Sequence, residues 1–267
     1  MCDTCGCNVT PGNEHLVAVG GHLATTSSGS ESVEVLKGLL DANDHQAAHN
    51  REHFQAHGIL AINLMSSPGA GKTSLLEATI DALGAELRIA VIEGDLETEN
   101  DARRIRLKGV PAIQITTGSA CHLDAHMVHT ALHELDLDAL DVVFIENVGN
   151  LVCPASFDLG QHQNAALLSS PEGHDKPAKY PVMFRAADVV LITKGDLLEV
   201  LGDFDPQVAA SYVRQLANPA PLFALSSKTG EGMDAWLTWI RQQVGALRAA
   251  PSTRAHGHDH HHTHSHP

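Results

Sequence analysis

The chain alternates between short apolar runs rich in β-branched residues and longer segments whose apolar residues recur every three or four positions. The short runs predict strands over residues 59–65, 88–92, 112–115, 142–145, 165–168, 189–193 and 222–225. The longer segments predict helices over residues 71–83, 100–108, 121–134, 206–216 and 233–247. Strands that alternate with helices in this way are typical of a parallel sheet covered on both faces. We therefore predict a three-layer α/β fold with a mainly parallel sheet.

A further helical pattern runs from residue 32 to residue 57, with a break expected near Asn43. It places His45, His49, His53 and His57 four residues apart, so that one helix face carries four imidazoles. A solvated surface and a metal site both fit this spacing. We favour the solvated surface, because neutral histidine is an ordinary surface residue.

Length and charge narrow the function classes. A chain of 267 residues can bury one sizeable α/β core and still carry tails. Its 17 Lys and Arg stand against 32 Asp and Glu, which disfavours nucleic acid and anionic membranes as partners. No apolar run approaches the roughly 20 residues of a membrane span, and the N-terminus lacks signal-peptide features. We expect a cytoplasmic protein whose five cysteines are metal ligands or reduced thiols.

The loop S-S-P-G-A-G-K-T joins the first predicted strand to its helix. It matches the phosphate-binding pattern G-x-x-x-x-G-K-[ST] except that Ser66 replaces the first glycine. In such a loop Gly69 and Gly71 let the backbone approach the phosphates, Lys72 meets the β and γ oxygens, and the Thr73 hydroxyl holds Mg²⁺. The alternative is a glycine-rich turn, which the strand–loop–helix context disfavours.

Two later motifs indicate which nucleotide binds. Residues 193–196, T-K-G-D, follow a predicted strand and are similar to the base motif of GTPases. The carboxylate of Asp196 can accept both N–H donors of guanine, which adenine does not offer, and Lys194 can lie over the ring. Ser226, Ser227 and Lys228 form a loop, after the next strand, that is similar to the one that backs guanine in the same proteins. Together they favour GTP over ATP.

Two motifs with acidic residues are candidates for the segments that respond to the γ-phosphate and Mg²⁺. Glu146-x-x-Gly149 ends a strand, so that the Gly149 N–H can meet the γ-phosphate and Glu146 can lie near Mg²⁺. Asp95, in E-G-D after the second strand, is the candidate second carboxylate near Mg²⁺ or the attacking water. The expected catalytic residues are thus Lys72, Asp95 and Glu146. The full nucleotide-binding set is Gly69, Ala70, Gly71, Lys72, Thr73, Ser74, Gly149, Lys194, Asp196, Ser227 and Lys228.

A candidate metal site adjoins the switch. Cys121 and His122 begin a predicted helix, and Cys153 lies four residues after Gly149. Thiolates and imidazole suit Zn²⁺ or Ni²⁺, and a helix N-terminus would lower the pKa of the cysteine. Alternatively, Cys121 merely starts the helix and Cys153 is a small buried hydrophobe. Three ligands leave the set incomplete, so a water or a second subunit could complete it.

The two ends of the chain carry more potential ligands. Cys2, Cys5 and Cys7 form a C-x-x-C-x-C loop that can wrap one metal ion. Seven of the 19 histidines lie between residues 256 and 266, in a tail that would bind divalent metals more loosely. We interpret this tail as native, because its histidines are interspersed with other residues. His126, His129 and His133 are interpreted as surface residues.

Several stretches together resemble the hydrogenase nickel-incorporation GTPase family, HypB. They are N-L-M-S-S-P-G-A-G-K-T from residue 63, E-G-D from 93, T-G-S-A-C-H-L-D-A from 117, E-N-V-G-N-L-V-C-P from 146 and T-K-G-D from 193. Serine at the first position of the phosphate loop is usual in that family. The resemblance implies a P-loop GTPase of the class that dimerises around nucleotide, with slow GTP hydrolysis. It also implies nickel delivery to the [NiFe] hydrogenase large subunit precursor, together with the nickel and zinc accessory protein HypA.

The resemblance assigns ligands to two metal sites: Cys121, His122 and Cys153 in the GTPase domain, and Cys2, Cys5 and Cys7 near the N-terminus. We divide the chain into a metal-binding arm (1–30), a helical segment (31–58), a P-loop GTPase domain (59–250) and a His-rich tail (251–267). The predicted function is that of a GTP-hydrolysing nickel metallochaperone acting as a homodimer. The alternatives are a nickel and zinc storage protein and an accessory GTPase for another nickel enzyme such as urease.

Overall fold

The structure, a computed structural model, describes residues 30–95, 99–118 and 120–250, with the backbone alone over residues 30–37. The predicted ligands Cys2, Cys5 and Cys7 and the tail over residues 251–267 lie outside the described residues. Within the described part, no helix is long and apolar enough to cross a membrane.

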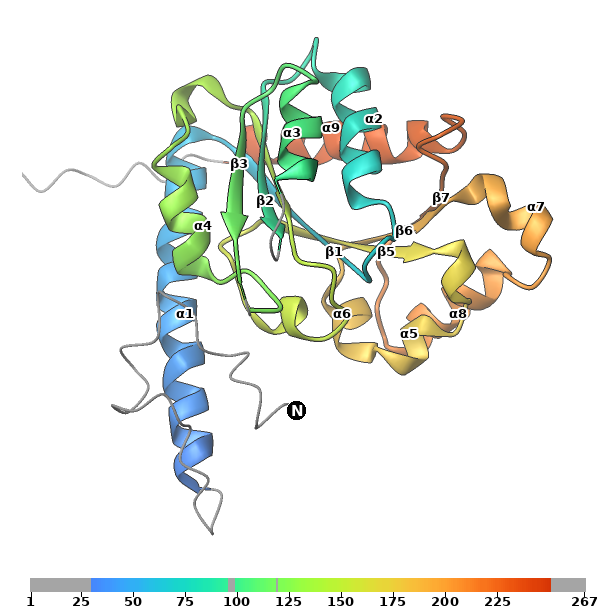
Figure 1. The fold of residues 1–267 in the computed structure, drawn as a ribbon, viewed down its shortest axis with the longest axis horizontal. Coiled ribbons are helices and arrows are strands. Elements are labelled where there is room, and N and C mark those ends of the chain that lie inside the picture. The colour runs from blue at the N-terminus through green and yellow to red at the C-terminus, as the bar shows by residue number, and fades with distance from the viewer. Residues whose placement is uncertain (1–29, 96–98, 119, 251–267) are drawn as a thin grey trace, which may run out of the picture.

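Seven parallel strands form one sheet in the order β3-β2-β4-β1-β5-β6-β7 (Figure 1). The strands are β1 (Leu60–Ser66), β2 (Ile89–Asp95), β3 (Ala112–Thr116), β4 (Val142–Glu146), β5 (Gln163–Ser169), β6 (Val189–Thr193) and β7 (Leu222–Ala224). Every residue of β1, β4 and β6 is buried, because helices cover both faces of the sheet. All seven predicted strands are confirmed.

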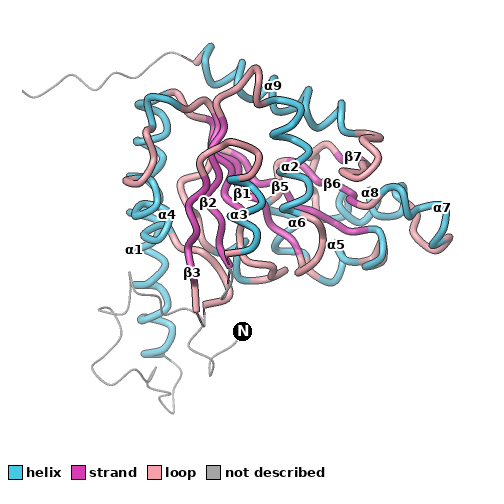
Figure 2. The backbone as a smooth tube through the Cα atoms, turned by 45° about the horizontal axis from the view of Figure 1, so that its top comes forward, coloured by secondary structure: helices cyan, strands magenta, loops and turns pink. Residues whose placement is uncertain are grey.

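Helices lie on both faces of this sheet. They are α1 (Ser30–His57), α2 (Lys72–Leu83), α3 (Asn100–Arg106), α4 (Ala125–Leu132), α5 (Lys176–Lys179), α6 (Pro181–Ala186), α7 (Leu198–Leu201), α8 (Pro206–Gln215) and α9 (Met233–Ala249). Along β1, Leu60, Ile62 and Leu64 join the core under α2 and α9, whereas Ala61 joins the core under α1 and α4. A third cluster packs α6 and α8 against β5 and β6. Figure 2 shows α1 and α4 side by side along one flank of the sheet.

Two predicted helix boundaries are wrong. Helix α1 is continuous through Asn43, whose buried side chain donates to the Asp158 carbonyl (2.8 Å) and accepts from the Ala125 N–H (2.9 Å). Helix α4 begins at Ala125 rather than at Cys121, because Asp124 caps it by accepting from the Met127 N–H at 2.8 Å. Cys121 therefore precedes the helix instead of starting it.

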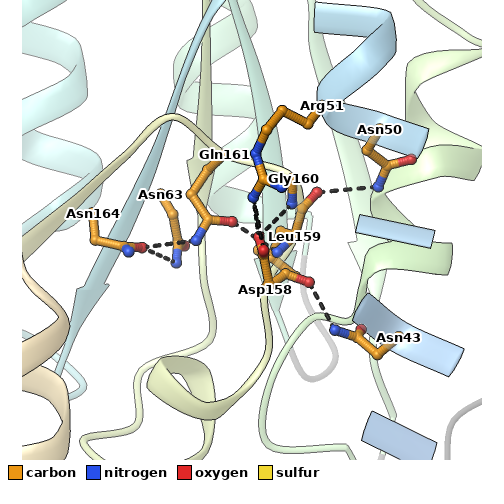
Figure 3. Close-up of polar contacts among 9 residues, drawn as sticks. All are labelled: Asn43, Asn50, Arg51, Asn63, Asp158, Leu159, Gly160, Gln161 and Asn164. Carbon is orange, nitrogen blue, oxygen red and sulfur yellow. Dashed lines mark hydrogen bonds and ion pairs between the residues drawn. The ribbon is translucent and has the colours of Figure 1, made fainter. Parts of the chain in front are cut away.

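Side-chain hydrogen bonds fix α1 to the segment that follows Cys153 (Figure 3). The Arg51 guanidinium donates to both carboxylate oxygens of Asp158 at 2.9 and 2.7 Å. Asn50 donates to the carbonyl of Leu159 at 3.1 Å. A Cβ on Gly160 would lie 2.6 Å from the Ala47 carbonyl, so only glycine permits this close approach to the helix. Helix α1 is thus docked onto the α/β domain at residues 158–160.

Candidate nucleotide and metal site

The phosphate loop connects β1 to α2 and needs its glycines. Gly69 (φ 72°) and Gly71 (φ 95°) adopt left-handed backbone conformations, which residues other than glycine rarely adopt. Lys72 is buried and donates from Nζ to the Ser66 hydroxyl at 3.1 Å. Ser66, the residue that departs from the common pattern, therefore contacts the lysine expected to meet the phosphates.

Three carboxylates gather beside this loop. Oxygens of Glu93, Asp101 and Glu146 lie within 4.8 Å of one another, and the Thr73 hydroxyl donates to Glu146 Oε1 at 2.9 Å. Burial, reinforced by the charge of Glu146, raises the pKa of Glu93 to about 8. Burial also raises the pKa of Glu146 to about 7, although Lys72 opposes the shift.

This carboxylate group suits a hard cation. Glu93 Oε2 and Glu146 Oε2 are buried without a hydrogen-bond partner, and carboxylate oxygens are the protein ligands that Mg²⁺ prefers. The predicted carboxylate Asp95 is not in this group; its carbonyl accepts from the Thr117 N–H at 2.9 Å. Glu93 and Asp101 were not predicted. Glu93 belongs to the same E-G-D motif as Asp95. Its burial distinguishes it as the residue of the carboxylate group, and burial cannot be read from the sequence.

The switch candidate contacts the phosphate loop directly. A Cβ on Gly149 would lie 2.8 Å from Pro68 Cα, closer than real contacts allow, so glycine lets the two loops touch. The Thr193 hydroxyl donates to the Ala70 carbonyl at 2.7 Å and so links the base motif to the same loop. All three motifs stand at the carboxyl ends of parallel strands, which is where open α/β sheets bind their ligands.

The base motif is held in a defined geometry. Lys194 adopts a left-handed conformation (φ 57°), and the Gly195 N–H donates to the Leu225 carbonyl at 2.9 Å. The buried Ser226 hydroxyl donates to Asp196 Oδ1 at 2.7 Å. Ser226 is thus a positioning residue beyond the predicted set. Of the predicted neighbours in that loop, Ser227 is half-buried and Lys228 is exposed.

The predicted metal ligands come together. One ligand atom each from Cys121, His122 and Cys153 lie within 4.8 Å of one another, with Cys121 Sγ and His122 Nδ1 at 3.8 Å. His122 is fully buried, its ring stacks on Phe157 at 3.9 Å between centroids, and its Nε2 has no hydrogen-bond partner. Burial lowers the pKa of His122 to about 4, so the imidazole is neutral and can donate a lone pair. The donor set suits a borderline divalent metal.

Asn147 links the switch loop to the metal ligands. Its buried Oδ1 accepts from the N–H of Leu123 (3.1 Å) and of Val148 (3.0 Å), and its Nδ2 donates to Asn63 Oδ1 (3.2 Å). Leu123 directly follows His122. A Cβ on Gly94 would lie 2.7 Å from the Leu123 side chain, so the E-G-D motif also packs against this residue. Both acidic motifs therefore contact Leu123.

Comparisons with known proteins agree with this geometry. A family model described as "CobW/HypB/UreG, nucleotide-binding domain" matches residues 60–223. Over 224 residues the chain is 52% identical to the hydrogenase maturation factor HypB of Azotobacter chroococcum mcd 1, spanning 83% of this chain and 73% of the relative.

Two solved structures share the fold. HypB from Helicobacter pylori in complex with nickel is 43% identical with a TM-score of 0.74, over 77% of this chain and 96% of that one. The hydrogenase maturation factor HypB from Archaeoglobus fulgidus is 38% identical with a TM-score of 0.72, over 77% and 100%. The predicted P-loop GTPase fold is confirmed.

Proposed function

The chain belongs to the CobW/HypB/UreG family and, within it, to the hydrogenase maturation factors HypB; from this premise we propose that it is a GTP-hydrolysing nickel metallochaperone. In this proposal it binds Ni²⁺ or Zn²⁺ and delivers nickel during [NiFe] hydrogenase maturation. One observation carries the proposal: Cys153 lies on the same loop as Glu146 and Gly149, and its sulfur gathers with ligand atoms of Cys121 and His122.

The nucleotide half of the proposal assigns a role to each group around the phosphate loop. Lys72 binds the β- and γ-phosphates, and Thr73, Glu93, Asp101 and Glu146 are the groups that would hold Mg²⁺. When bound, that ion neutralises charge on the phosphates during transfer. Asp95 remains the predicted group beside the attacking water.

Selection of GTP depends on Asp196. Both of its oxygens are acceptors, so the carboxylate can receive the two N–H donors that guanine presents. The hydroxyl of Ser226 fixes the rotamer of this carboxylate by donating to Oδ1 at 2.7 Å. Lys194 covers the base in the same proposal.

The cargo half of the proposal concerns nickel. Cys121, His122 and Cys153 supply two sulfurs and one nitrogen, and the unpartnered Nε2 of His122 is a buried donor atom that a metal ion would satisfy. A fourth ligand comes from water or from a second copy of the chain, which fits a homodimer promoted by GTP or metal. We further propose a HypA-type protein and the hydrogenase large subunit precursor as partners, in the cytoplasm.

Nucleotide and metal are coupled in this proposal through two short paths. Three residues separate Gly149 from Cys153, and the side chain of Asn147 holds the backbone of Leu123, next to His122. If the γ-phosphate orders residues 146–149, both paths change the spacing of the metal ligands. The nucleotide can alter metal affinity only by favouring one spacing over the other.

Replacement of Cys153 by alanine tests the metal site. We use a full-length background in which Cys2, Cys5 and Cys7 are serine, so that Cys121 and Cys153 are the only thiols. The seven tail histidines, together with His53 and His129 of another group that could hold a metal ion, are replaced by glutamine so that they do not compete for nickel. Cys153→Ala should weaken Ni²⁺ binding at least tenfold, about 1.4 kcal/mol, because a thiolate ligand is lost, and thiolate-to-nickel absorbance should fall with it.

The same variant should keep its GTP affinity within about twofold. Ser156→Ala is the matched control, because Ser156 is exposed in the same helical turn (Cys153–Ser156) and should leave nickel binding unchanged. Loss of GTP binding in Cys153→Ala would contradict a separate metal site. Retention of tight nickel binding would contradict the role of Cys153 as a ligand.

A further inference from the structure

Four histidines meet where α1 packs against α4. His49 and His53 come from α1, His129 comes from α4, and His133 directly follows the last residue of α4. Ligand atoms of His49, His53 and His129 lie within 4.8 Å of one another. His133 Nε2 lies 3.1 Å from His129 Nε2, and their ring centroids are 4.6 Å apart. We call these four residues the α1–α4 histidine cluster.

A buried amide fixes the tautomer of His129. Asn50 Nδ2 donates to the carbonyls of Ala125 (2.7 Å) and Leu159 (3.1 Å), so its Oδ1 must act as an acceptor. That oxygen lies 3.1 Å from His129 Nδ1, which therefore carries the proton. The lone pair of His129 is consequently on Nε2, the atom that faces His133. Metal-binding histidines are commonly oriented by such a hydrogen bond from the other ring nitrogen.

The spacing of the cluster suits a tetrahedral metal ion. A Zn–N bond of about 2.0–2.1 Å places two ligand nitrogens about 3.3–3.4 Å apart. The 3.1 Å between His129 and His133 is close to that value. The other donors lie within 4.8 Å, and His49 is exposed and His53 only half-buried, so small side-chain rotations can bring them in.

The rings of the cluster favour the neutral, metal-binding form. Burial lowers the pKa of His53, with further lowering by His49, His133 and His57, whereas Glu52 opposes the shift. Burial likewise lowers the pKa of His129, with its histidine neighbours adding to the effect. Imidazole donors suit zinc, nickel and copper rather than Mg²⁺ or Ca²⁺.

We propose that the α1–α4 histidine cluster is a second transition-metal site, which takes Zn²⁺ or Ni²⁺ through imidazole nitrogens alone. It is separate from the Cys121 site and does not depend on the nucleotide. Because its ligands come from two helices, a bound ion cross-links α1 to the GTPase domain. Metal loading therefore stabilises the docked position of α1.

The test uses a full-length background without the competing ligands. All five cysteines are replaced by serine, and the seven tail histidines by glutamine: His256, His258, His260, His261, His262, His264 and His266. This background is dialysed at pH 7.5 against buffered free Zn²⁺, and bound zinc is counted per chain. The double variant His53→Gln/His129→Gln should lose one zinc equivalent, or bind it at least tenfold more weakly. His45→Gln is the matched control, because His45 is exposed one turn earlier on α1 and lies outside the cluster.

Two further measurements keep the outcome decisive. His49→Gln alters an exposed residue and should weaken zinc binding without disturbing the fold, which GTP binding verifies. X-ray absorption of the bound zinc should show only nitrogen and oxygen donors, with imidazole scattering. The proposal is overturned if the background binds no zinc equivalent, if the double variant binds zinc as the background does, or if His45→Gln loses as much zinc as the double variant.

Discussion

Two buried glutamates, Glu93 and Glu146, stand where the ends of β2 and β4 meet the phosphate loop. Each has one carboxylate oxygen without a hydrogen-bond partner, and burial raises both pKa values. Groups held in this way destabilise the fold once they ionise, and such a cost is typical of residues kept for a ligand. A cation held by both carboxylates would remove that cost.

The pH dependence of stability follows from Glu93. Its pKa is about 8 in the fold against an ordinary value of 4.5, so between these values the folded state binds more protons than the unfolded state. The free energy of unfolding therefore falls as the pH rises through this window. Glu93→Gln should stabilise the protein by a few kcal/mol at pH 8 and by almost nothing at pH 4.5, measured by urea unfolding without Mg²⁺ or nucleotide.

The control for this experiment is Glu134→Gln, which makes the same chemical change at an exposed position. It should leave the slope of stability against pH unchanged. If Glu93→Gln gave the same small effect at both pH values, Glu93 would not be buried as a neutral acid.

Gly149 has no side chain, so Pro68 of the phosphate loop can pack directly against its backbone. Gly149→Ala forces a methyl group to within 2.8 Å of the Pro68 backbone, so the loops must separate. We expect a loss of about 1–3 kcal/mol of stability and weaker GTP binding by titration. The control Gly245→Ala places a methyl group in open space at an exposed position of α9 and should stabilise the protein by about 0.5–1 kcal/mol. Unchanged GTP affinity in Gly149→Ala would show that GTP binding does not need the contact between Gly149 and the phosphate loop.

Sequence patterns predict roles for Lys72, Thr73 and Asp196 because short motifs fix their chemistry and their neighbours along the chain. They did not predict Asp101, and they predicted Ser226 as part of the loop that backs guanine but not as the hydrogen-bond partner of Asp196. Asp101 comes to the site from α3, and Ser226 comes from the loop after β7, so their proximity depends on the tertiary fold. Burial, which distinguishes Glu93, is likewise set by the packed sheet and its helices.

At the scale of elements, α1 is packed as a structural part of the α/β domain. The expected break at Asn43 is absent because its side chain hydrogen-bonds to neighbouring segments instead of to its own backbone. The side chain of this residue links α1, the first turn of α4 and the segment after Cys153. Local propensity, which disfavours asparagine within helices, is overridden by these contacts.

Asn43→Ala should therefore destabilise the protein. The substitution leaves the Asp158 carbonyl and the Ala125 N–H without their partner, at a cost of about 2–3 kcal/mol. Thermal or urea unfolding of the full chain measures this cost. Asp44→Ala, at the adjacent exposed position, should change stability by less than about 0.5 kcal/mol. Equal effects of the two substitutions would show that Asn43 does not fix α1 in place.

The start of α4 is a second place where the local sequence pattern does not predict the structure. Apolar periodicity extends back to residue 121, yet the helix begins only after Asp124, which caps it. The four residues before Ala125 are thereby free of helical geometry. His122 can then enter the core while Cys121 stays half-buried beside Cys153.

At the scale of the whole molecule, the order of the strands brings the candidate nucleotide site and the candidate metal site next to each other. Strand β4 lies between β1 and β2, so its last residue, Glu146, pairs with Glu93 of the E-G-D motif, and the loop that follows touches the phosphate loop. Alternating strands and helices predicted the parallel sheet, because that pattern leaves few other arrangements. Strand order was not predicted, since it depends on long-range packing. The predicted surface position is confirmed for His49 and His133, which are exposed, but the meeting of the four histidines between α1 and α4 was not predicted for the same reason.

The central claim is that nucleotide state sets metal affinity through residues 146–153. The most direct test is Ni²⁺ affinity at the Cys121 site, in the background lacking the other three thiols, with GDP and with a non-hydrolysable GTP analogue. We predict affinities that differ at least fivefold, about 1 kcal/mol of coupling, and a smaller difference in Asn147→Ala, which loses the hydrogen bond to Leu123. Equal affinities with the two nucleotides would contradict the coupling.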